Sequence, residues 1–166
     1  MEYSQYESYL EECATNTLAI GHAPNDEHFV VYDIEDVFSE LEHETNYPAL
    51  FCENPELKHQ DNYSDNHHEV MSGAFMILSP VESGDKAELK RVKNDNLIIA
   101  KDVVKKMYND LKLGNINGFD LNNVMYNKVG PVFDKHYGWR VTFIVKNWTD
   151  MSLDVSKYQN ETKFEI

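Results

Sequence analysis

The chain has 166 residues and a formal net charge of −14; 42% of its residues are hydrophobic and 27% are charged. These values suit one globular domain with a core of ordinary size and exclude a chain that is disordered throughout. No apolar run approaches the roughly 20 residues that a membrane-spanning helix needs, and the acidic, polar N-terminus is not typical of a secretory signal. We expect Cys13 and Cys52 to be reduced, mostly buried thiols of an intracellular protein.

The negative charge is concentrated in the N-terminal part of the chain. Residues 1–70 contain 17 Asp or Glu and one basic residue, Lys58, so this part has a net charge of −16. Residues 71–166 contain 12 acidic and 14 basic residues, which gives a net charge of +2. A chain this acidic repels the nucleic-acid backbone, so we exclude nucleic-acid binding by phosphate neutralisation.

The first predicted element is a helix over residues 3–20. Its apolar and small side chains recur at spacings of three and four, the pattern of an amphipathic helix with one buried face. That face holds Tyr6, Tyr9, Leu10, Cys13, Thr17 and Ile20. We expect the tyrosines to pack at the edge of the core and the segment from Gly21 to Pro24 to end the helix.

The next segment is acidic and contains two short apolar patterns. Residues 29–34 fit a short strand, and residues 33–41 fit a short helix. The pair Tyr47-Pro48 is a break, because the residue before a proline is pushed toward extended geometry.

A short strand over residues 49–53 is then predicted to stop at Asn54-Pro55. Residues 54–69 are polar turn formers and are expected to form an exposed loop or hairpin connection. Six potential metal ligands lie here: His59, Asp61, Asp65, His67, His68 and Glu69. Their spacing matches no zinc or calcium motif, so we predict a solvated loop and no metal site. A small metal-binding protein or enzyme that uses His67 and His68 remains an alternative.

The middle of the chain predicts a long strand followed by a long helix. Residues 70–82 form the strand, in which Gly73 marks a bulge or a close approach of another backbone. Residues 83–114 form the helix: Asp85 and Glu88 resemble a capping box, and Gly114 suits the position after its end. The predicted buried face consists of Leu89, Leu97, Ala100, Val104, Met107, Tyr108 and Leu111. The segment 94–96 is a weak point where the helix could start late.

Two further strands complete the predicted fold. Residues 119–128 form one, a corner follows at Gly130-Pro131, and the last strand covers residues 137–146. In this strand Trp139, Val141, Phe143 and Val145 alternate with Arg140, Thr142, Ile144 and Lys146, which is the period of a half-buried strand. We therefore predict an α+β fold with a mostly antiparallel sheet, one long helix packed on one face and an N-terminal helix. Residues 1–147 form this single domain, and residues 148–166 form a C-terminal extension or arm.

The sequence contains no signature of catalysis. Phosphate-binding glycine loops, a nucleophile elbow and a Cys-x-x-Cys pair are all absent. His136 is better explained as a turn residue than as a base, because nothing near it in sequence offers a nucleophile or an orienting partner. We predict no catalytic residue, no cofactor-binding residue and no cofactor.

The order and anchors of the elements resemble a known family. The pattern is Tyr47-Pro48 before a short strand, the strand at residues 74–78, a long helix begun by Asp85, and a Gly-Trp strand that opens at Gly138. It resembles the tail terminator and tail-completion (head-to-tail joining) proteins of tailed bacteriophages over residues 45–147. The resemblance implies a structural virion protein without turnover, whose subunits form a sixfold or twelvefold ring around the DNA channel.

The same resemblance implies the partners and the location. The ring would contact neighbouring head-to-tail connector or tail proteins, and DNA would pass through it without specific binding. The protein would reside in the tail or neck of the virion, would assemble in the host cytoplasm and would have no membrane partner. An acidic lumen would repel the DNA backbone and let it slide. Another virion component, such as a connector adaptor, tail tube or cargo protein, and an acidic inhibitor that mimics DNA are alternative hypotheses.

The long helix also suggests how subunits join. Residues 86–112 contain eight basic and four acidic residues, whereas the N-terminal part of the chain is strongly acidic. A ring needs a heterologous contact, in which one patch meets a different patch on the next copy. We therefore predict assembly contacts at Lys101, Lys105 and Lys106 that pair with the acidic region of a neighbour.

Overall fold

The computed structural model describes residues 1–32, 45–61, 67–133, 135–152 and 154–157. The short helix expected over residues 33–41 lies outside these described residues. The elements in chain order are η1 (Tyr3–Gln5), α1 (Tyr6–Asn16), β1 (Phe29–Tyr32), β2 (Ala49–Asp61), β3 (His67–Pro80), α2 (Lys86–Leu113), β4 (Phe119–Val132), β5 (His136–Trp148) and η2 (Val155–Lys157).

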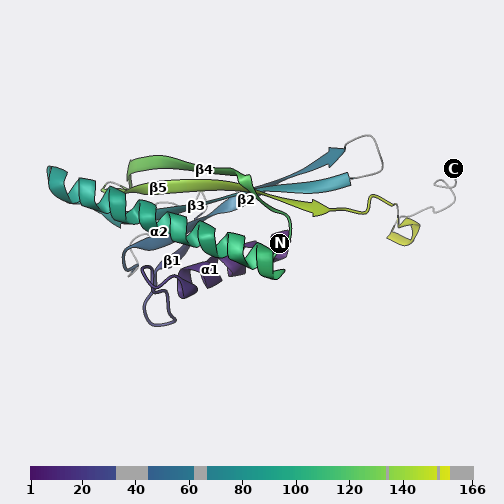
Figure 1. Cartoon of the computed structure of the whole chain (residues 1–166), viewed down its shortest axis with the longest axis horizontal. Coiled ribbons are helices and arrows are strands. Elements are labelled where there is room, and N and C mark those ends of the chain that lie inside the picture. Colours follow the sequence, from purple (N-terminus) through teal and green to yellow (C-terminus); the bar gives the residue numbers. More distant parts are fainter. Residues whose placement is uncertain (33–44, 62–66, 134, 153, 158–166) are drawn as a thin grey trace.

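The strands form one five-stranded sheet with the order β1-β2-β3-β5-β4. The pair β1–β2 is parallel, and every other neighbouring pair is antiparallel. The two helices lie side by side, with α1 near β1 and β2 and with α2 across β3, β5 and β4 (Figure 1). The predicted α+β fold, with a mostly antiparallel sheet, a long helix and an N-terminal helix, is confirmed.

Local chemistry satisfies backbone groups at both ends of α2. Asp85 caps α2 by accepting a 2.9 Å hydrogen bond from the Glu88 backbone N–H, and Gly114 ends it with a φ of 78°, in the left-handed region that favours glycine. α1 is shorter than predicted and stops at Asn16, because Thr17 turns into extended geometry. The predicted buried face of α1 is nevertheless correct through Ile20.

The predicted weak point at residues 94–96 is wrong, because α2 runs through it without a break. Asn96 is buried: it donates a 3.0 Å hydrogen bond to the Tyr137 carbonyl and accepts one of 3.2 Å from the Ser79 hydroxyl. These two bonds compensate for burying a polar side chain. The buried face of α2 therefore includes two polar residues; its members are Val92, Asn96, Ile99, Ala100, Val103, Val104, Met107 and Asp110. Of the predicted face, Leu89, Leu97, Tyr108 and Leu111 are only half-buried.

Two strands extend beyond the prolines that were predicted to stop them. β2 continues past Asn54-Pro55 to Asp61, because a bulge between Glu53 and Glu56 places the extra residue outside the regular ladder. β4 likewise continues past Gly130-Pro131 to Val132 through a register shift, and Val132 pairs with His136 at the start of β5. The predicted loop at residues 54–69 is thus largely the two strands of a hairpin.

Gly73 lies opposite the β2 bulge and makes room for Tyr6. A Cβ at this position would lie 2.7 Å from the Tyr6 ring and 2.6 Å from the Phe143 ring. Because that space is free, the Tyr6 hydroxyl reaches the strand, donating to the Ala74 carbonyl at 2.8 Å and accepting from the Ala74 N–H at 2.9 Å. The close approach predicted at Gly73 therefore involves aromatic rings and not another backbone.

The main core lies between the helices and the sheet. Phe75, Ile77 and Phe143 are at most 1% exposed, and Val104, on the predicted buried face of α2, is 4% exposed. Trp139 and Leu111 are only partly buried, which for Leu111 corrects the predicted buried position. Trp139 stays at the rim because its indole N–H donates a 2.7 Å hydrogen bond to the Lys93 carbonyl on α2. A second, smaller cluster contains Ala49, Phe51, Met76 and Leu78.

Candidate assembly surfaces

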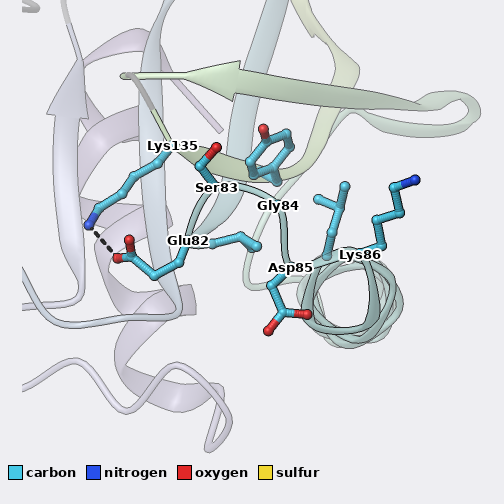
Figure 2. Close-up of a pocket in the computed structure, with 9 residues that line it drawn as sticks. Glu82, Ser83, Gly84, Asp85, Lys86 and Lys135 are labelled. Carbon is cyan, nitrogen blue, oxygen red and sulfur yellow. Dashed lines mark hydrogen bonds and ion pairs between the residues drawn. The ribbon is translucent and has the colours of Figure 1, made fainter.

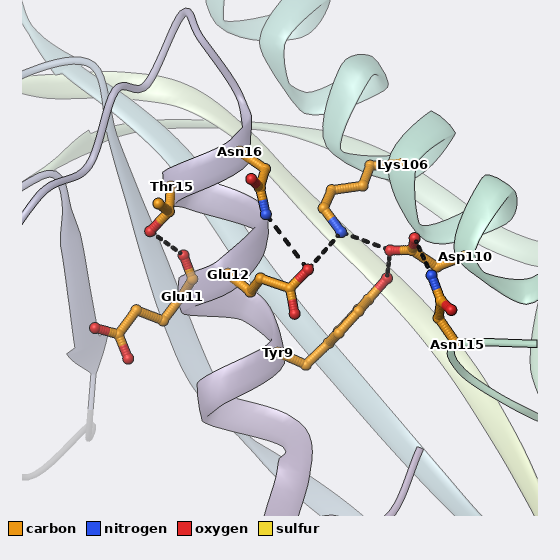
Figure 3. A network of polar contacts seen from close by, with 8 residues as sticks. All are labelled: Tyr9, Glu11, Glu12, Thr15, Asn16, Lys106, Asp110 and Asn115. Atoms are coloured by element: carbon orange, nitrogen blue, oxygen red, sulfur yellow. Dashed lines mark hydrogen bonds and ion pairs between the residues drawn. The ribbon is translucent and has the colours of Figure 1, made fainter.

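Lys106 is the centre of a polar network that joins α2 to α1 (Figure 3). Its ammonium group donates to Asp110 at 2.6 Å and to Glu12 at 3.0 Å. Asp110 also accepts from the Tyr9 hydroxyl at 2.8 Å and from the Asn115 amide at 3.3 Å. The side chains of Lys106 and Asp110 are only 20% and 8% exposed. Lys106 is therefore occupied within its own subunit, whereas it was predicted among the residues that contact a neighbour.

In this network Lys106 and Asp110 each stabilise the charged form of the other. Burial would raise the pKa of Asp110, but hydrogen bonds from Lys106, Tyr9 and Asn115 outweigh it and hold that pKa below its usual value. Burial would lower the pKa of Lys106, but hydrogen bonds to Asp110 and Glu12 raise it above the usual value. The pair is thus charged at neutral pH, and its bonds to Glu12 and Tyr9 join α1 to α2.

Lys101 and Lys105 lie on the opposite flank of α2, beside β4. Both residues are exposed, and Lys105 forms an exposed 2.7 Å ion pair with Asp102 of the same helix. No ion pair to Lys101 is found among the described residues. These two lysines flank a groove of about 310 Å³ whose other lining residues are apolar or aromatic: Val104, Tyr108, Leu121 and Tyr126. We call this surface the α2–β4 groove.

The acidic counterpart lies on α1. Residues 1–20 contain four glutamates and no basic side chain, and Glu2, Glu7, Glu11 and Glu12 are all exposed. Figure 3 shows Glu12 pointing toward Lys106 and Glu11 pointing away from α2, where it lies 3.5 Å from His22. Because α1 lies near β1 and β2 while Lys101 and Lys105 lie beside β4, the acidic and basic surfaces occupy opposite lateral edges of the subunit (Figure 1).

Two other pockets hold no reactive constellation. The pocket at the start of α2 has a volume of about 160 Å³, and its Glu82 is paired with Lys135 at 2.8 Å (Figure 2). The second, of about 450 Å³, lies between α2 and the segment around Tyr47, and its Arg91 is paired with Glu88 and Asp95 on the same helix. Among the lining residues of both pockets, no hydrogen bond joins a nucleophile to a base.

The strand register places His67 and His68 on opposite faces of the β2–β3 hairpin. His67 is opposite Asp61, with 3.6 Å between Nδ1 and Oδ1. His68 points to the other face of the sheet, since neighbouring residues of a strand alternate, and packs edge-on against Trp148. No group of three or more metal-ligating side chains occurs within the described part of the chain; Asp65 lies outside it.

The other residues considered for a chemical role, a histidine and two cysteines, have structural roles in the fold. His136 is the first residue of β5, directly after the turn, with Nδ1 3.0 Å from the Phe133 carbonyl and its ring 4.8 Å from that of Tyr47. Cys13 and Cys52 are free and fully buried. Burial raises the pKa of each thiol to about 12, so neither is a ready nucleophile.

The sequence reasoning missed Leu18, Leu121 and Tyr126, which the fold exposes or places at the groove. Leu18 was assigned to the first helix, but it lies in the turn after Asn16 and is 99% exposed. The sequence did contain an indication of this exposure. Thr17 and Ile20 belong to the predicted buried face, and Leu18, which lies between them in sequence, does not. The composition of the groove depends on how β4 pairs with β5, which no local pattern shows.

Comparison with known proteins adds no family assignment: no protein-family model matches the chain, and no curated protein matches it either. Within the described residues, no helix combines the length and apolar character that crossing a membrane would require.

Proposed function

We propose that this chain is a structural virion protein of a tailed bacteriophage, a ring-forming subunit of the head-to-tail connector or tail terminator around the DNA channel. One observation carries the proposal: the acidic surface of α1 and the basic flank of α2 lie on opposite lateral edges of one subunit. Such a subunit can place its basic edge against the acidic edge of the next copy, and repetition of that heterologous contact closes a ring.

The element order that suggested the family supports the same proposal. A long helix initiated by Asp85 lies over a mostly antiparallel sheet, and a Gly-Trp strand occupies the interior of that sheet. Because one fold serves many functions, the arrangement of charge is the stronger argument. The proposed partners are identical copies in a sixfold or twelvefold ring and the connector or tail proteins above and below it. DNA passes through the channel without specific contacts.

The magnitude of the charge contribution sets the test. An exposed ion pair contributes only about 0–1 kcal/mol, so several pairs must act together at each contact. Complementary charge mainly fixes register and speeds docking. Screening weakens it as the Debye length falls from about 10 Å at 0.1 M salt to about 3 Å at 1 M. We therefore expect rings at low salt to dissociate at high salt.

The test compares two charge-reversal variants by sedimentation velocity at both salt concentrations. Lys101→Glu with Lys105→Glu should prevent ring formation and leave the subunit folded. The matched control, Lys86→Glu with Lys90→Glu, makes the same charge change at exposed positions near the start of α2 and should assemble like wild type. Rings that persist in the first variant and at 1 M salt would refute charge-driven assembly.

A further inference from the structure

Leu18 is an apolar side chain that the fold presents to solvent. Among the large hydrophobic residues of the described chain it has the highest exposure, 99%. Its turn is held by hydrogen bonds from the Ile20 and Gly21 N–H groups to the Thr17 carbonyl, at 2.8 and 3.0 Å. Thr17 and Ile20 are buried on either side of it. The backbone that carries Leu18 is therefore held in a defined geometry, which reduces the backbone entropy lost when a partner covers the side chain.

A single exposed leucine is common on protein surfaces, but this chain also offers a surface that fits one. The α2–β4 groove has a volume of about 310 Å³, whereas an apolar cavity of about 150 Å³ already accommodates benzene. Val104 lies at its base with 4% exposure, and Leu121 is 43% exposed at its side. An aliphatic side chain that entered the groove would cover these apolar atoms and leave the two lysine head groups in water.

The leucine and the groove lie on opposite sides of α2, so they cannot meet within one subunit. Ala19, the neighbour of Leu18, lines the pocket between α2 and Tyr47, while Leu121 and Tyr126 belong to β4 at the other edge of the sheet. Figure 1 shows α1 and β4 on opposite sides of α2. A projecting side chain and a groove on opposite edges of one subunit can form a heterologous contact between copies.

We propose that Leu18 of one copy inserts into the α2–β4 groove of the next copy. This inference rests on the proposed ring function and identifies its contact. Charge favours this occupant, because Glu7 and Glu11 lie on the same helix that leads to Leu18, and Lys101 and Lys105 flank the groove. The leucine supplies the apolar anchor, and the surrounding charges set the register. Each copy offers its leucine to one neighbour and its groove to the other. Repetition of this contact gives a ring when the rotation from copy to copy returns to the first copy.

Cysteine crosslinking tests this contact directly. The full chain carries Leu18→Cys and Leu121→Cys together and is treated with a short bismaleimide at 0.1 M salt. The native thiols of Cys13 and Cys52 are 0% exposed, so they do not compete. A head-to-tail contact predicts a ladder of crosslinked species from the double variant. An equal mixture of the two single variants should give dimers and nothing larger, because each copy then carries only one reactive half of the contact.

The outcomes separate the contact from the proposed function. Rings seen by electron microscopy without a crosslinked ladder would refute this contact and leave the ring proposal standing. Neither rings nor a ladder would overturn both. Crosslinked dimers from Leu18→Cys alone would mean that Leu18 meets its own counterpart, a twofold contact that contradicts the inference.

A second measurement tests how much the Leu18 side chain contributes to association. Leu18→Ser should weaken association at each contact by roughly ten- to hundredfold, the amount expected for leaving a leucine side chain unburied. Its side chain makes no contribution to the isolated fold at 99% exposure, so the melting temperature of the monomer should not change. Leu113→Ser is the matched control, since Leu113 is 66% exposed at the end of α2. Equal weakening by both variants, or by neither, would overturn the assignment.

Discussion

Replacing Lys106 with Met separates a structural lysine from an assembly lysine. Met keeps most of the apolar stem, but it removes the ammonium group, which lies 5.4 Å from the centre of the Tyr9 ring and faces Asp110. Asp110 would then be buried with only the neutral bonds from Tyr9 and Asn115. Removing one partner of a buried ion pair costs about 3–5 kcal/mol. Since two neutral bonds remain and Lys106 is 20% exposed, we expect a loss of about 3 kcal/mol, the lower end of that range.

Urea unfolding at pH 7, followed by tryptophan fluorescence, measures this loss in the monomer. Lys101→Met and Lys105→Met are the matched controls, because both lysines are exposed on the other flank of α2. Each control should stay within about 0.5 kcal/mol of wild type, as surface substitutions usually do. A loss below about 1 kcal/mol for Lys106→Met, or a loss equal to that of the controls, would refute the structural role of the network.

The same variant should alter how stability depends on pH. The pKa of Asp110 is lowered in the folded protein, so its ionised form stabilises the fold above the unfolded pKa of about 3.9. That contribution is lost as pH falls through the folded pKa. In Lys106→Met the ionised form of Asp110 no longer stabilises the fold, because burial then opposes ionisation. The stability difference between wild type and variant should therefore be largest near neutral pH and should shrink toward acid.

Three further predictions address the core, the hairpin and the tail. Phe143→Ala should cost about 3–5 kcal/mol in urea unfolding, because this ring is 1% exposed; a loss below about 1 kcal/mol would mean that β5 is not central. His59, His67 and His68 replaced together by Ala should melt like wild type with or without zinc or a chelator, whereas a zinc-dependent shift confined to wild type would favour a metal site. Truncation after Thr149 should give a folded monomer that fails to assemble, and its entry into rings would show that the tail is dispensable.

The sequence predicted those parts of the fold that short-range patterns determine. The alternation of β5 follows from Val141, Phe143 and Val145, whose side chains are all buried. The ends of α2 follow from Asp85 and Gly114, since a side-chain cap and a left-handed residue act within one turn. These features need no knowledge of distant partners.

Several of the errors have one physical cause, which is a partner far away in sequence. Asn96 looked like a helix breaker, yet it is stabilised inside α2 by Tyr137, 41 residues further on. Pro55 looked like a strand end, but the bulge opposite Gly73 accommodates it. The predicted contact of Lys106 with a neighbouring copy stays a prediction; within the subunit its partners are Asp110, four residues away, and Glu12, 94 residues away. Leu18 escaped notice because its exposure depends on where α1 ends.

Negative-stain electron microscopy of the purified full chain at 0.1 M salt tests the central claim most directly. We expect closed rings of one size with sixfold or twelvefold symmetry and a central channel, together with their loss in the Lys101→Glu, Lys105→Glu variant. Monomers at every accessible concentration, without rings or open filaments, would contradict the claim and favour an acidic protein that acts on a basic partner as a single subunit.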